Sequence, residues 1–122
     1  MTAIEELVTV ARTTIPRFFP VEMNQEVKQF PAAVYQIVSR IPNASFDGGS
    51  KMDFLHIDIT VFADAPGQAL QLAEELRIDL ESETFTVIQS CRYRESGGIQ
   101  YNDFLQKYAV QYEYRLSVNR LN

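Results

Sequence analysis

The chain has 122 residues, which is the size of one folded domain with a single hydrophobic core. Hydrophobic residues make up 46% of it, with 8 Phe and 6 Tyr, and this content excludes a disordered chain. The net charge is −5 and the 11 basic residues are spread along the sequence, which argues against a basic nucleic-acid-binding face. A single cysteine, Cys91, excludes an intrachain disulfide and a thiolate metal cage.

The first expected element is a helix over residues 2–14. Thr2 followed by Glu5 forms a capping-box pair at its start. Its apolar residues then return at helical spacing: Ile4, Leu7, Val8 and Ala11. Acidic residues stand where a secretory signal needs positive charge, and no apolar run approaches the ~20 residues of a membrane-spanning helix. We therefore expect the protein to be made and kept in the cytoplasm.

The segment from 15 to 50 mixes proline-bounded chain with one strand. Residues 15–20 hold two phenylalanines between prolines, which predicts extended chain along the edge of the core. A short strand is expected near residues 21–23. Residues 32–41 are rich in β-branched side chains, which favours a strand, and residues 42–50 are a loop by composition.

A second strand and a second helix are expected next. Residues 53–63 alternate between large apolar and polar side chains, as a half-buried strand does. Asp64 is expected to cap the following helix, with Pro66 in its first turn. The apolar stripe of this helix is Ala69, Leu72, Ala73, Leu76 and Leu80.

Two further strands complete the expected fold. The third covers residues 85–94, a loop with a glycine pair covers 95–103, and the fourth covers 108–118, so the last two strands form a hairpin. The whole chain (1–122) is then one α+β domain, with a mainly antiparallel four-stranded sheet and two helices packed on one of its faces. On the third strand, one side is expected to carry Phe85, Val87, Cys91 and Tyr93.

The alternation in the second and fourth strands separates a core face from a polar face. The expected core residues are Leu55, Ile57, Ile59, Val61, Tyr108, Val110, Tyr112, Tyr114, Leu116 and Val118. Ser117 also lies on the polar face, whose candidate functional residues are His56, Asp58, Thr60, Gln111, Glu113 and Arg115. A polar sheet face that the chain itself leaves uncovered predicts a surface for other subunits or the lining of a channel.

The same residues leave a chemical alternative open. His56 and Asp58 point to the same side of a strand, with Thr60 next in line, as an acid–base pair or half of a metal site would. A third ligand would have to come from elsewhere, and no other His or Cys cluster supplies one. We therefore expect no catalytic, cofactor-binding or metal-binding residues. The alternative is a small α+β ligand-binding or enzymatic domain that uses the His56, Asp58 and Thr60 face.

Several segments in order carry a family resemblance. They are Phe18-Phe19-Pro20 after a short helix, residues 30–38, residues 57–62, the Ala- and Leu-rich helix 69–77, and Tyr101-Asn102-Asp103 before a long last strand. This order resembles the tail-completion proteins of long-tailed bacteriophages and prophages, which include tail terminators and head–tail joining proteins. Many members have Trp near the end of the second strand, where this chain has Phe62.

The resemblance implies a structural, non-enzymatic role without cofactors. It implies a ring of identical subunits, commonly six, that caps the tail tube and joins it to the head connector. Its partners are then other copies of itself, the tail-tube protein and the connector protein, with no membrane. DNA passes through such a ring without specific binding. The resemblance places the protein in the host cytoplasm during assembly and afterwards in the virion tail.

Overall fold

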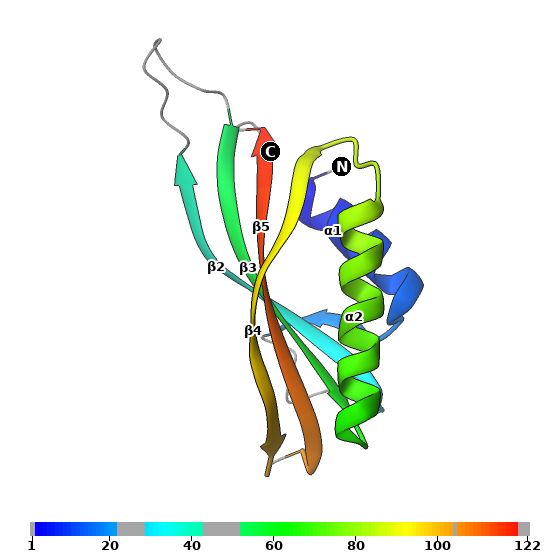
Figure 1. The fold of residues 1–122 in the computed structure, drawn as a ribbon. Coiled ribbons are helices and arrows are strands. Elements are labelled where there is room, and N and C mark those ends of the chain that lie inside the picture. Colours follow the sequence, from blue (N-terminus) through cyan, green and yellow to red (C-terminus); the bar gives the residue numbers. More distant parts are fainter. Residues whose placement is uncertain (1, 22–28, 43–51, 104, 120–122) are drawn as a thin grey trace.

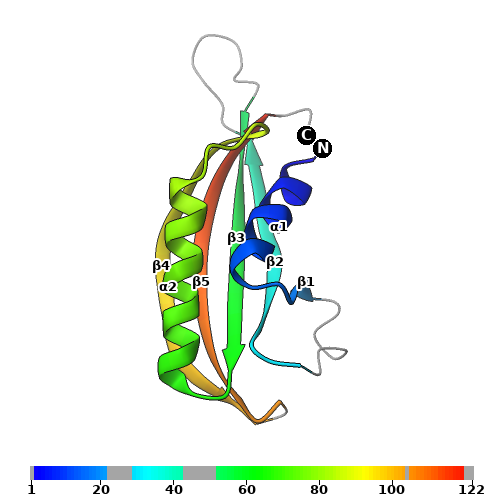
Figure 2. The ribbon, with the colours of Figure 1, turned by 90° about the vertical axis from the view of Figure 1, so that its right-hand side faces the viewer.

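The computed structural model describes residues 2–21, 29–42, 52–103 and 105–119. A single sheet has the strand order β1-β2-β3-β5-β4, and both helices lie on the same side of it (Figures 1 and 2). The α+β class and the placement of both helices on one face are confirmed. In chain order the elements are α1 (Ala3–Thr14), β1 (Phe18–Pro20), β2 (Ala32–Pro42), β3 (Met52–Ala63), α2 (Pro66–Ser82), β4 (Ile88–Asn102) and β5 (Lys107–Asn119).

The sheet has five strands and is mixed, so the expectation of four mainly antiparallel strands is wrong in part. The segment expected as irregular extended chain forms the short strand β1, which pairs in parallel with β2. The Phe18 ring is fully buried and stacks on the Tyr35 ring with 5.2 Å between centroids, which holds β1 against β2. Pro20 lies on the outermost strand, where its missing N–H costs no ladder hydrogen bond.

The N-terminal helix has the expected cap and is anchored to the sheet. The Glu5 N–H donates to Thr2 Oγ1 over 3.1 Å, and the helix ends at Thr14, shortly before Pro16. Near the end of α1, the Arg12 guanidinium donates to the carbonyl oxygen of Phe18, with 3.1 Å from Nη2. The helix is thereby tied to the first strand across the intervening turn.

The second helix begins one residue later than expected, and Asp64 is not its cap. Ala65 holds the N-cap position without a side-chain hydrogen bond, and Pro66 follows in the first turn. The Asp64 carboxylate instead pairs with Lys107, with 2.8 Å between Oδ1 and Nζ. The expected apolar stripe is confirmed, with Leu72 half-buried and the others fully buried: Ala69, Ala73, Leu76 and Leu80.

The fourth strand continues through the segment expected as a loop. β4 runs from Ile88 to Asn102, and its ladder with β5 is interrupted by several register shifts. One shift falls at the glycine pair, where Gly98 has a φ of 85°, a conformation that favours glycine. The hairpin between the last two strands is confirmed, but β4 extends to Asn102 and β5 begins at Lys107, so most of the predicted loop belongs to β4. Bulges accommodate the extra residues, so β4 continues through the two glycines.

A buried carboxylate sets the start of β4. Glu6 of α1 accepts the backbone N–H groups of Thr86, Val87 and Ile88 over 2.8 to 2.9 Å. Burial alone would raise the pKa of Glu6, but these three donors hold it below the ordinary value of 4.5. Because the N–H groups of Thr86 and Val87 donate to Glu6, they do not pair with a neighbouring strand, and β4 begins at Ile88, later than the expected residue 85. Ile88 fills the core there, and Val87 is only half-buried.

Aromatic contacts attach α2 to strands β4 and β5. The Tyr93 and Tyr112 rings lie 4.9 Å apart, and the Arg77 guanidinium lies 4.0 Å from the Tyr93 centroid. The Tyr112 hydroxyl donates to the Glu74 carboxylate, and burial raises the pKa of this phenol. The Tyr112 hydroxyl beneath α2 is thus paired, as burial of a polar group favours. Most of the expected strand near 21–23, and the loop expected at 42–50, lie outside the described residues.

Candidate interface on the outer face of the sheet

The face of the sheet opposite the helices, here called the outer face, carries all six candidate residues. On β3, Leu55 and Ile57 are buried on the helix side, so His56 and Asp58 project the other way. In the ladder between β3 and β5 three pairs stand directly opposite each other: His56 with Arg115, Asp58 with Glu113, and Thr60 with Gln111. The structure therefore gathers these six side chains on one surface.

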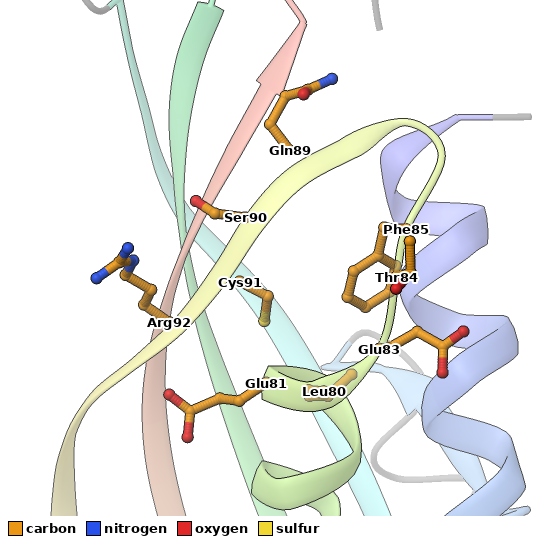
Figure 3. A pocket seen from close by; sticks show the side chains of 9 residues that line it. All are labelled: Leu80, Glu81, Glu83, Thr84, Phe85, Gln89, Ser90, Cys91 and Arg92. Carbon is orange, nitrogen blue, oxygen red and sulfur yellow. The ribbon is translucent and has the colours of Figure 1, made fainter.

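Two residues of β4 extend this surface, although neither was among the six candidates predicted for it. Arg92 stands opposite Arg115, and Glu95 stands opposite Glu113. Figure 3 shows Arg92 pointing away from α2. Residue 95 had been assigned to a loop, so its place on the face was missed. The alternation of Arg92 with the inward-facing Cys91 was the available signal.

The charges on the outer face are sorted by sign into two neighbouring rows that cross the strands. The basic row consists of Arg92, Arg115 and His56. The acidic row consists of Glu95, Glu113 and Asp58. It lies two residues after the basic row on β3 and two residues before it on the antiparallel β5. Adjacent rows on one face are about 7 Å apart at the usual rise per strand residue. Ser39 and Gln36 of β2 continue the basic and the acidic row with neutral side chains.

Local contacts fix some of these side chains and leave others unpaired. The Arg115 guanidinium lies 4.7 Å from the Phe54 ring centroid, and Gln111 Nε2 donates to Asp58 Oδ2 over 3.1 Å. Burial raises the pKa of Asp58, and the charge of His56 opposes this rise. In the part of the chain that the structure describes, no ion pair involves Arg92, Arg115 or the two glutamates of the acidic row.

One end of the outer face is closed by aromatic side chains. Phe62 is buried there against Phe30, with 6.4 Å between ring centroids, and the Lys107 ammonium lies 5.1 Å from the Phe30 centroid. The charged rows, which are exposed on β4 and half-buried on β3 and β5, lie beyond this cover. The accessible part of the face is therefore the stretch around the basic and acidic rows.

The chemical alternative requires His56, Asp58 and Thr60 to converge. A hollow of about 220 Å³ next to the glycine bulge is lined by Thr60 and Gln111, but by neither His56 nor Asp58. Among the described residues, no group of three His, Cys, Asp or Glu side chains is arranged to hold a metal ion. The three residues thus follow one strand, and among the described residues the hollow that Thr60 lines does not include the other two.

A larger hollow lies between the end of α2 and the start of β4 (Figure 3). It has a volume of about 480 Å³ and is lined by polar side chains such as Glu81, Glu83 and Gln89, with Cys91 at its base. Burial raises the pKa of the Cys91 thiol to about 12, and the nearby Glu81 carboxylate adds to this rise. The thiol is therefore protonated at neutral pH, which agrees with the expected role as a buried hydrophobe. Among the described helices, none is long and apolar enough to cross a membrane.

Comparison with known proteins finds similarity in structure but none in sequence. No protein-family model matches the sequence, and no curated protein sequence matches it. The fold is similar to that of a chain in the virion of a native gene transfer agent (GTA) particle, with a TM-score of 0.65. The likeness covers 95% of this chain and 96% of that chain at 9% sequence identity. At this identity the similarity establishes a shared fold.

Proposed function

We propose that this protein is a structural component of a tailed, phage-like particle. The observation that carries the proposal is the likeness along nearly the full length of both chains to a chain of a GTA virion. The order of segments in the sequence independently resembles phage tail-completion proteins, so two separate comparisons favour the same kind of particle. A structural role involves no catalysis and no cofactor.

The finer role that we propose is that of a tail terminator. In this role several copies, commonly six in proteins of this type, form a ring that caps the tail tube and joins it to the head connector. The chain offers two sheet edges for ring contacts, the long strand β4 and the short strand β1. Ring symmetry then repeats each modest contact around the circle. The chain is made in the host cytoplasm and ends in the virion tail.

The outer face is proposed as a surface for subunit contact in preference to a channel wall. A wall past which DNA slides should repel phosphates along its whole length. The basic row, with Arg92 and Arg115, would instead attract them. Six charged or titratable side chains of both signs suit a protein surface of complementary pattern better.

Deletion of the gene in the strain that produces the particles tests the proposed function. Electron microscopy of the lysate is expected to show filled heads and separate tails that fail to join. A plasmid copy of the wild-type gene should restore joined particles and serves as the control for effects on neighbouring genes. Joined, infectious or DNA-transferring particles in normal numbers without the gene would refute the proposal.

A further inference from the structure

The two charged rows of the outer face make that face complementary to itself. Arg92 and Arg115 stand side by side on neighbouring strands, and so do Glu95 and Glu113. Like charges directly opposite each other in a sheet are unfavourable. In the described part of the chain these four side chains form no ion pairs that would offset this repulsion. A second surface that places acidic groups over the basic row and basic groups over the acidic row would offset the repulsion within both rows.

We propose that two copies of this chain dock through their outer faces about a two-fold axis. The axis runs parallel to the rows and midway between them. This rotation reverses the strand direction, so that the basic row of each copy lies over the acidic row of the other. A two-fold axis along the strands would instead place the basic row over the partner's basic row and the acidic row over its acidic row. That arrangement would be repulsive. The charges therefore select the antiparallel of the two face-to-face arrangements.

The contact is small and depends on salt. Four strands about 4.8 Å apart and two rows about 7 Å apart give roughly 270 Å² per copy. Stable dimers bury about 800 Å² per partner, so this pair is a weak one. Exposed charges are screened over about 10 Å at 0.1 M salt, so the pair forms at low salt and high protein concentration. It uses the face that the proposed function assigns to subunit contact, but it does not rest on the ring.

Charge-reversal variants test the pairing through mixing. The first variant, Arg92→Glu with Arg115→Glu, gives an acidic outer face, and the second, Glu95→Arg with Glu113→Arg, gives a basic one. Sedimentation velocity at low salt is expected to show concentration-dependent dimers for the wild type and monomers for each variant alone. An equimolar mixture of the two variants should form a one-to-one dimer that is at least tenfold tighter than the wild-type dimer.

A matched control separates the face from overall charge. The control variant, Glu75→Arg with Glu83→Arg, changes the net charge as the second variant does. Both positions are exposed and lie away from the outer face, Glu75 in α2 and Glu83 directly after it. This control should dimerise like the wild type. A wild type that stays monomeric at all concentrations, or folded variants that fail to associate when mixed, would overturn the pairing. Because the assay contains no particle component, its outcome is independent of the gene-deletion test.

Discussion

The two faces of the sheet differ in how their polar and charged side chains are paired. On the helix side, the buried Glu6 carboxylate accepts three backbone N–H groups, and the Tyr112 hydroxyl donates to Glu74. On the outer face, charges of one sign stand together, as Arg92 and Arg115 do. The helix side packs within one chain, whereas the four like-charged residues of β4 and β5 on the outer face form no ion pair among the described residues.

This difference separates stability from assembly. Burial of apolar side chains and paired polar groups on the helix side supplies most of the free energy of folding. The charges of the outer face contribute little to folding, because they form no buried ion pairs among the described residues and water still reaches them. Substitutions on the two faces should therefore affect two different measurements, the free energy of unfolding and the affinity for another subunit.

The largest expected effect is the loss of a core side chain on the helix side. Leu116→Ala truncates a fully buried side chain in the second half of β5. The free energy of unfolding should fall by about 3–4 kcal/mol, as for other buried Leu→Ala changes. Urea denaturation followed by circular dichroism measures it. Arg115→Ala, the neighbouring residue on the outer face, is the control and should cost about 1 kcal/mol or less through the lost contact with Phe54. Equal losses for the two variants would contradict the contrast between the faces.

A somewhat smaller effect is expected at the carboxylate that joins α1 to β4. Glu6→Ala leaves three backbone N–H groups without their acceptor and should cost about 2–3 kcal/mol at pH 7. The folded pKa of Glu6 lies below its ordinary 4.5, so its contribution is complete above that pH and is lost as the pH falls through the folded value. Stability measured against pH should therefore drop less steeply below pH 5 in the variant.

The neighbouring Glu5→Ala serves as the control for Glu6. Glu5 is exposed in the same helical turn and accepts only the Thr2 hydroxyl over 3.2 Å. Its removal should change the free energy of unfolding by about 0.5 kcal/mol or less, with the wild-type pH profile retained. A Glu6→Ala variant that matched this control would show that the three hydrogen bonds contribute nothing net.

The smallest effect on folding is expected on the outer face. Glu113→Gln removes one charge from the acidic row and should leave stability within about 0.5 kcal/mol of the wild type, with a slight gain from reduced repulsion. Self-association at low salt should weaken several-fold in the same variant. A loss of stability above about 1 kcal/mol would mean that this glutamate already has a stabilising partner within its own chain.

Much of the fold could be predicted because local signals agreed with the final structure. The alternation in residues 55–61 and 108–118 identified two strands, their buried face and the six polar residues opposite. The capping pair Thr2 and Glu5 marked the first helix correctly. These signals depend on side-chain periodicity and on caps, both of which are local properties of the sequence.

The errors arose where distant contacts override local composition. Gly97 and Gly98 indicate a loop by composition, but pairing with β5 keeps the segment in the sheet and confines the glycines to a bulge. Asp64 has the chemistry of a helix cap, but it pairs with Lys107, which is 43 residues away by number (107 − 64). The charged rows could not be seen for the same reason, because they exist only once the register between β4 and β5 is known.

We propose that this chain forms the junction between the tail tube and the head connector of a tailed particle. The most direct measurement is native mass spectrometry of the purified protein mixed with the tail-tube protein of the same particle, with the same sample viewed by electron microscopy. We expect a ring of identical copies seated on the end of each tube. Tubes with bare ends and a chain that shows neither rings nor bound copies at high concentration would contradict the claim.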